Sequence, residues 1–133
     1  MAQQEIEVIL MRQLASYLAT PIFIVDPNGT LVFYNEPAEK ILGQRFEETG
    51  ELPGDEWASA DRASDANGNP IPPEQRPLMI ALREHRPAHD RLWILGLDNQ
   101  RRCIEVTAFP LVGQAGRHLG AVAIFWEVPG ECE

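Results

Sequence analysis

The chain has 133 residues, of which 44% are hydrophobic and 23% charged, and these values predict one folded domain and exclude wholesale disorder. A formal net charge of −9 argues against a nucleic-acid partner, because binding to a phosphate backbone depends on clustered Lys and Arg. No apolar run approaches the roughly 20 residues that cross a bilayer, so we expect a cytoplasmic protein without a membrane partner.

Residues 1–19 predict an N-terminal amphipathic helix, because Gly and Pro are absent from its interior and apolar residues recur at helical spacing. One apolar row consists of Ile6, Leu10, Leu14 and Tyr17. A second row lies on another side of the helix, and we take it as the candidate surface for a homodimer: Val8, Met11, Ala15 and Leu18. The alternative is that one chain covers both rows.

The next segment predicts a β-hairpin followed directly by a short helix. Residues 22–25 are a continuous apolar run of strand length, which favours a central strand buried on both faces. Residues 26–29 (Asp-Pro-Asn-Gly) are typical of a tight turn, and residues 31–34 return as the antiparallel partner. Asn35 is predicted to cap the helix, which we expect to end at Gly43.

The second half predicts one longer helix and then strands. Residues 44–69 indicate only short helical turns and loops around an apolar anchor at Leu52 and Trp57. A helix is predicted from about residue 72 to about residue 86, between prolines. Three strands are expected after it, over residues 89–97, 101–110 and 118–128.

This order of elements predicts an α+β fold, with an antiparallel sheet of about five strands and helices on one face. Three stretches in this order resemble the PAS domain family. PIFIVDPNGTLVFYNEPAEKILG resembles its opening hairpin and Asn-led helix, DANGNPIPPEQRPLMIALREHRP the segment leading into its longest helix, and RRCIEVTAFPLVGQAGRHLGAVAIFWEV its closing hairpin. We therefore expect a PAS-like domain over residues 20–128, followed by a tail over residues 129–133.

The resemblance implies a sensory or interaction module. Such domains bind a small ligand or a signalling protein and commonly act as homodimers. Many members continue into an output domain through an Asp-Ile-Thr-like tripeptide, where this chain has Glu127-Val128-Pro129. We expect either a free-standing module or a fragment of a longer protein. Two alternatives stay open: a dimerisation module without a ligand, and a small α+β enzyme.

A cup between sheet and helices is the default place for a ligand. The side chains that we expect to line it are Phe33, Leu42, Trp57, Met79, Leu82, Trp93, Phe109, Val122 and Ile124. Each of them can equally fill a dry core. Several strands are apolar on both sides, so alternation does not determine which face points inward.

The positions of the Cys and His residues exclude some classes of cofactor but do not identify one. The photoadduct flavin sensors of the family need a Cys in the middle helices, and no Cys lies between Asn35 and Pro87, which excludes that class. Haem is disfavoured because His85 is predicted at an exposed helix end. Pro87 breaks the spacing that a metal site would need, so no metal ligand is assigned.

The remaining reactive side chains do not form a recognisable site. The two cysteines, Cys103 and Cys132, predict neither a metal site nor a disulfide framework. No acid or histidine is paired with a recognisable nucleophile, and we expect no catalytic residue and no enzymatic activity.

Overall fold

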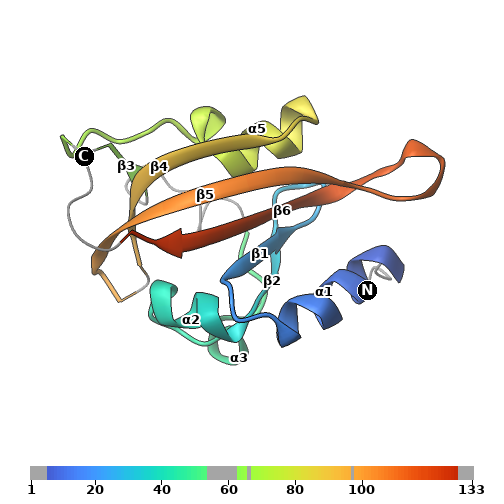
Figure 1. Cartoon of the computed structure of the whole chain (residues 1–133), viewed down its shortest axis with the longest axis horizontal. Coiled ribbons are helices and arrows are strands. Elements are labelled where there is room, and N and C mark those ends of the chain that lie inside the picture. The colour runs from blue at the N-terminus through green and yellow to red at the C-terminus, as the bar shows by residue number, and fades with distance from the viewer. Residues whose placement is uncertain (1–5, 54–62, 66, 97, 129–133) are drawn as a thin grey trace.

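The computed structural model describes residues 6–53, 63–65, 67–96 and 98–128 (Figure 1). A 6-stranded antiparallel sheet has the order β2-β1-β6-β5-β4-β3. Its strands are β1 Ile22–Val25, β2 Leu31–Tyr34, β3 Ala63–Ser64, β4 Ala88–Leu95, β5 Arg101–Val112 and β6 His118–Glu127. The helical elements are α1 Ile6–Tyr17, α2 Glu36–Leu42, α3 Phe46–Thr49, η2 Pro73–Gln75, α5 Pro77–Glu84 and η3 Gln114–Gly116.

The predicted α+β architecture is confirmed, and the sheet has one strand more than expected. The additional strand, β3, pairs antiparallel with β4 at one edge of the sheet. It comprises only Ala63 and Ser64, and so short a segment carries no alternation that a sequence pattern can reveal.

Strand β1 is central, as its apolar run predicts. It pairs with β2 on one side and with β6 on the other. Ile22 and Ile24 face one side of the sheet, whereas Phe23 and Val25 face the other, and Ile24 and Val25 are fully buried. A strand covered on both faces tolerates no polar side chain, which explains the unbroken run of apolar residues.

The turn after β1 is also as predicted. The Asp26 carboxylate accepts hydrogen bonds from the backbone N–H groups of Asn28 (2.9 Å) and Thr30 (3.0 Å). Gly29 has a φ of +87°, a conformation that glycine adopts without strain. Local side-chain and glycine chemistry therefore closes the hairpin.

Asn35 caps α2, and its buried side chain does more than cap. Its Oδ1 accepts from the N–H groups of Ala38 (3.2 Å) and Ile22 (3.0 Å), and its Nδ2 donates to the Thr20 carbonyl (2.8 Å). One amide thus joins the start of α2, the start of β1 and the segment that follows α1. The helix ends at Gly43, which has a φ of 85°.

Two apolar clusters lie on opposite faces of the sheet. The inner cluster packs the sheet against α2 and α5, and its members include Val25, Leu31, Leu78, Ile104 and Phe125. The outer cluster lies on the α1 side, with Ile22, Ile24, Val32, Leu119 and Val122 at its centre. The inner face is therefore the cup, and the outer face is a second apolar surface.

Cys103 corrects an expectation from the sequence. It is buried in β5 and disulfide-bonded. Val128 donates its N–H to the Cys103 carbonyl (2.9 Å), so the end of β6 lies beside Cys103 despite the long separation along the chain. The other cysteine, Cys132, lies outside the described residues.

Candidate functional site

The inner face of the sheet lines a cavity of about 100 Å³. Its wall comes from five strands of the sheet, from the end of α2 and from the start of α5, with Phe23, Leu42, Leu78, Leu92, Ile104 and Phe125 among the lining residues. Alanines at positions 63 and 123 also line it, and their short side chains leave the space that larger residues would fill. The cavity is therefore a consequence of small residues on a strand face that otherwise carries bulky ones.

Arg76 is the only polar side chain among the described residues that line the cavity. It is the N-cap residue of α5 and is only 6% exposed. Its Nε and Nη2 both donate to the Ile71 carbonyl, at 3.1 and 3.0 Å. A guanidinium stays protonated in proteins, so a positive charge lies at an apolar wall.

Sequence reasoning missed Arg76 because it considered only apolar side chains for the pocket. A signal was present in the Arg76-Pro77 pair, since Pro marks the first turn of a helix and the residue before it is the cap. The start of α5 points at the cup in this fold, and that placement brings Arg76 to the cavity.

A row of aromatic rings leads from the cavity to the α2–α3 corner. Phe125 meets Phe23 edge to face at 4.9 Å, Phe23 lies 5.7 Å from Tyr34, and Tyr34 lies 5.3 Å from Phe46. Edge-to-face pairs at these distances are favourable. Phe23, which lines the cavity, therefore packs directly against Tyr34.

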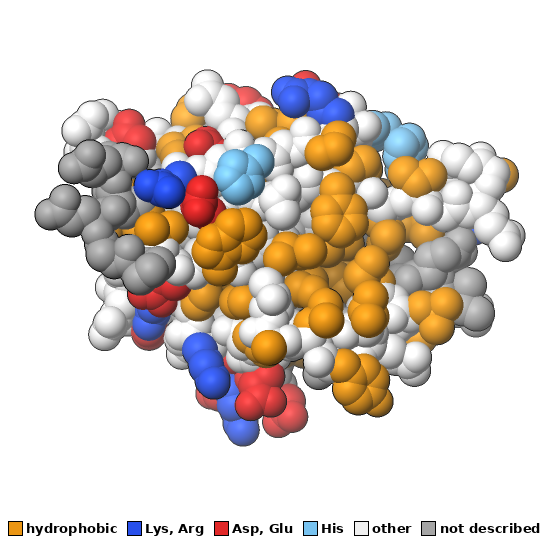
Figure 2. Space-filling model, viewed as in Figure 1, with side chains coloured by type: hydrophobic (Ala, Val, Ile, Leu, Met, Phe, Trp, Pro, Cys, Tyr) orange, Lys and Arg blue, Asp and Glu red, His pale blue; other side chains and the backbone are white. Residues whose placement is uncertain are grey.

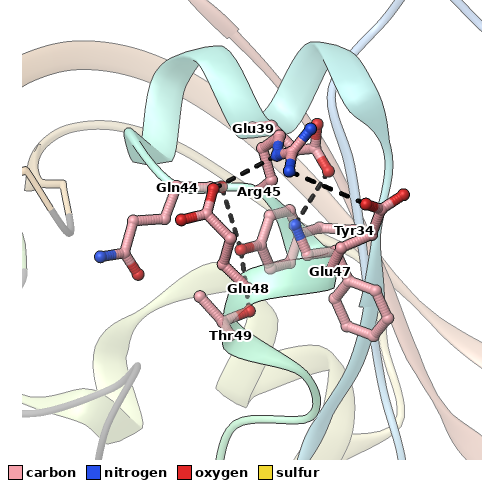
Figure 3. Close-up of polar contacts among 8 residues, drawn as sticks. Tyr34, Glu39, Gln44, Arg45, Glu47, Glu48 and Thr49 are labelled. Atoms are coloured by element: carbon pink, nitrogen blue, oxygen red, sulfur yellow. Dashed lines mark hydrogen bonds and ion pairs between the residues drawn. The ribbon is translucent and has the colours of Figure 1, made fainter.

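Tyr34 is anchored at the α2–α3 corner by its hydroxyl (Figure 3). The phenol oxygen lies 3.1 Å from the Gln44 carbonyl, to which it donates, and 3.0 Å from Thr49 Oγ1. Burial raises the pKa of Tyr34 above its ordinary value of 10.0; the hydrogen bond with Thr49 lowers this pKa, and the charges of Glu39 and Glu48 raise it. The folded protein therefore holds the neutral phenol more tightly than the unfolded chain does.

Charged side chains cover the same corner (Figure 3). Arg45 Nε lies 3.2 Å from Glu48 Oε1, and the Phe46 N–H donates to Glu39 Oε2 at 2.9 Å. The Arg45–Glu48 pair is exposed, so it contributes little to stability. These contacts order the turn over Tyr34 and do not form a reactive site.

Replacing Tyr34 by Phe is expected to lower the free energy of unfolding at pH 8 by about 1 kcal/mol, because the hydroxyl loses its partners. As pH rises above 10, the unfolded wild type releases the phenol proton before the folded state does, so wild-type stability falls. The difference between wild type and Tyr34→Phe should therefore narrow between pH 8 and pH 11. Urea unfolding measures both values, with Tyr17→Phe as an exposed control; a constant difference would contradict the expectation.

Of the pocket candidates on helices, one lines the cavity and two are packed in the core beside it. Leu42 lines the cavity. Met79 is buried in α5, and Leu82 packs against the inner cluster, but neither lines the cavity. Trp57 lies outside the described residues.

Most of the candidates on strands lie on the wrong face. Phe33, Phe109, Val122 and Ile124 belong to the outer cluster. Trp93 lies between Leu92 and Ile94, which both line the cavity, so strand alternation directs its ring to the other face, where Arg101 stacks at 5.0 Å. The strand residues that do line the cavity include Phe23, Ile94, Val106 and Phe125.

The two apolar rows of α1 also differ from their expected roles. Met11, a predicted dimer residue, packs against the outer cluster of its own chain. Leu18 is 39% exposed, whereas the side chains of Val8 and Ala15 lie outside the described set. In the first row, Leu10, Leu14 and Tyr17 are 56%, 53% and 87% exposed. The exposed side chains of α1 therefore include three from the row that was not predicted as the dimer surface.

Hydrophobic side chains gather on the outer face of the molecule (Figure 2). They lie over β1 and β6 and extend toward α1. Trp126 of β6 and Val112 of β5 add exposed apolar surface at 39% and 48%. Exposed apolar surface of this kind commonly marks an interaction site.

The histidines do not form a cofactor site within the structure described. His85, which ends α5, is exposed, and its ring lies 3.5 Å from that of His118 rather than at the cavity. No group of three or more His, Cys, Asp or Glu among the described residues is arranged to hold a metal ion. The cavity of about 100 Å³ is smaller than the roughly 300 to 1,000 Å³ of typical small-molecule sites.

Comparison with known proteins identifies the fold. The family model of the PAS fold matches residues 9–128. No curated protein sequence matches the chain. Similar solved structures include the PAS domain of a Colwellia psychrerythraea protein, which is 16% identical with a TM-score of 0.64 over 91% of this chain and 96% of that chain.

Two further structures extend this similarity. The PAS domain of Bordetella pertussis BvgS is 14% identical, with a TM-score of 0.67 over 95% of this chain and 89% of that chain. The Rhodobacter sphaeroides LOV protein is 15% identical, with a TM-score of 0.71 over 93% of this chain and 68% of that chain. Identities this low show a shared fold alone. Because the family match covers nearly the whole described fold, the chain belongs to the PAS family.

Proposed function

We propose that this PAS domain senses a small molecule in its inner cavity and transmits its presence through a homodimer to a signalling partner. PAS domains are in general sensory and signalling modules rather than enzymes. The observation that carries the proposal is the apolar cavity of about 100 Å³ with the buried charge of Arg76 at its wall.

The proposed dimer uses the exposed row of α1 together with the outer sheet face. Leu10, Leu14 and Tyr17 project from a helix that already contacts the outer cluster through Met11. In a twofold dimer both copies use the same surface patch. The apolar surface of each copy would therefore be covered by the apolar surface of the other. The inner face of the sheet lines the cavity and its outer face is part of the proposed dimer surface. A ligand that shifts the strands would therefore alter the dimer interface.

A module that dimerises without any ligand is the second candidate, and the exposed row of α1 favours it. Native mass spectrometry of the purified protein distinguishes the two. Retained extra mass, or a small molecule that raises the melting temperature, supports sensing. A dimer that no small molecule stabilises would leave the dimerisation module as the function.

Replacing Leu14 by Glu is expected to weaken the dimer about a hundredfold, because an unpaired charge buried in an interface costs on the order of 3 kcal/mol. Gln13→Glu is the matched control, since it adds one negative charge to an exposed neighbouring position of the same helix. Sedimentation velocity over a concentration series measures both dissociation constants. A monomeric wild type, or equal constants for the two variants, would remove this surface from the proposal.

The cytoplasm is the location that we propose. No helix within the described part of the chain is long and apolar enough to cross a membrane. The disulfide at Cys103 counts against this location, because reducing compartments keep thiols reduced. Trapping thiols by alkylation in intact cells tests it: a reduced Cys103 supports the cytoplasm, and an oxidised one indicates an oxidising compartment.

A further inference from the structure

The strands that line the inner cavity present hydrocarbon to it. Their lining side chains are all apolar and include Phe23, Leu92, Ile104 and Phe125. Strand β6 pairs with β1 and β5, and β5 also pairs with β4, so the backbone N–H and C=O groups of these strands bond to one another in the plane of the sheet. An occupant of the cavity therefore meets apolar surface along the whole sheet side.

Arg76 is the only polar side chain on the described part of this wall, and it is engaged within its own chain. Its Nε and Nη2 both donate to the Ile71 carbonyl, at 3.1 and 3.0 Å. These bonds tie the start of α5 to the segment that precedes η2. The positive charge of Arg76 repels a cation. A carboxylate, in turn, would compete with the Ile71 carbonyl for the same donors.

The character of the wall decides between charged and uncharged occupants. An ion that leaves water for an apolar site loses its hydration, and the loss is large unless new hydrogen bonds replace it. An apolar molecule instead gains free energy in proportion to the apolar area that leaves water. The cavity wall supplies apolar contact, so it favours an uncharged molecule over an ion of the same shape.

The volume of the cavity gives the scale of the occupant. An engineered apolar cavity of roughly 150 Å³ binds benzene, and the space here is about 100 Å³. Ala63 and Ala123 contribute short side chains to its wall, and the space lies where larger residues would reach. One small ring, or a chain of a few carbons, is of this scale.

We infer that the ligand is a small uncharged apolar molecule, about the size of a single hydrocarbon ring, packed against Phe23, Leu92, Ile104 and Ala123. This inference rests on the proposed function, because it takes the cavity as the ligand site. It adds the chemical class of the ligand and assigns its selection to apolar contact.

Three probes carry the same ring and differ in charge: benzene, benzoate and benzylammonium. NMR titration of the full chain in sealed tubes measures their dissociation constants. Benzene should bind, and each of the two ions should bind at least about tenfold more weakly, because the wall does not replace the hydration of a charged group. Either ion binding as tightly as benzene would overturn the inference.

Two matched variants assign the binding to the cavity. Ala123→Val adds two methyl groups to the cavity wall and should weaken benzene binding at least about tenfold by occupying its space. Ala108→Val is the control, because Ala108 pairs with Ala123 across β5 and β6, belongs to the same inner cluster and does not line the described cavity. It should change the affinity by less than about threefold.

Ala63→Val, which also narrows the cavity, serves if Ala123→Val does not fold. Benzene affinity that is equal in the cavity variant and in Ala108→Val, or in the cavity variant and the wild type, would place benzene elsewhere and overturn the inference.

The two proposals fail differently. If none of the probes binds and the purified protein carries no small molecule, the cavity is not a ligand site and both proposals fall. If an ion binds as tightly as benzene and Ala123→Val weakens its binding, the ligand site stands. That result overturns only the assignment of an uncharged apolar ligand.

Discussion

Replacing Gly120 by Ala is expected to lower the free energy of unfolding by about 3 kcal/mol or more. Gly120 lies in β6 with a φ of +129°, a conformation that side-chain-bearing residues rarely adopt. A Cβ at this position would collide with the Val25 carbonyl oxygen and would lie 3.1 Å from Asp26 Cα. These are backbone atoms of β1 and its turn, and they cannot rotate away as a flexible side chain would.

Gly116→Ala is the control that separates collision from backbone strain. Gly116 has a φ of +71° near the tip of the same hairpin, and a Cβ there would meet nothing within 4 Å. Its substitution should cost only the strain of a left-handed residue, about 1 to 2 kcal/mol. Urea unfolding followed by circular dichroism measures both variants. Equal losses would show that the β1–β6 contact yields easily and that the close approach does not constrain the sheet.

The elements whose signals are local could be predicted from the sequence. Asp26 and Gly29 close the first hairpin with their own side-chain and backbone chemistry, so four residues determine the turn. Asn35 and Gly43 likewise mark both ends of α2. The unbroken apolar run from Ile22 to Val25 predicted a central strand, because only burial on both faces permits such a run.

The lining of the cavity could not be predicted, because it depends on which face of each strand turns inward. A shift of one position moves a side chain across the sheet. Val122 and Ile124 were predicted to line the pocket, yet Ala123 and Phe125 line it instead. Both faces of β6 are apolar, so no pattern distinguishes them. Bulky residues were also favoured as candidates, whereas the space is made by small residues such as Ala123.

The same ambiguity affected α1. Both of its rows are apolar, so the pattern does not determine which row packs against the sheet. The structure places Met11 against the sheet and leaves Leu14 exposed. The Thr20 carbonyl, shortly after this helix, accepts a hydrogen bond from the Asn35 side chain. The cap of a later helix therefore contacts the segment that follows the first helix.

Replacing Asn35 by Ala is consequently expected to lower the free energy of unfolding by about 3 kcal/mol, because three hydrogen bonds are lost and buried backbone groups are left without partners. Asn28→Ala is the matched control at an exposed turn position and should change stability by less than about 0.5 kcal/mol. Chemical denaturation measures both. If Asn35→Ala lowers the free energy of unfolding by less than about 1 kcal/mol, water must take over the hydrogen bonds that the side-chain amide makes.

Asn35→Asp separates the cap from the link to α1. An aspartate keeps the acceptor for the N–H groups of Ile22 and Ala38, but it cannot donate to the Thr20 carbonyl as Asn35 does. Its stability should fall between wild type and Asn35→Ala, and hydrogen exchange should rise at the Thr20 end of α1 while α2 stays protected. Equal exchange in wild type and Asn35→Asp would show that the donated bond does not hold α1. Because α2 also carries Leu42 into the cavity wall, Asn35 connects that wall through hydrogen bonds to the end of the helix that we propose as the dimer surface.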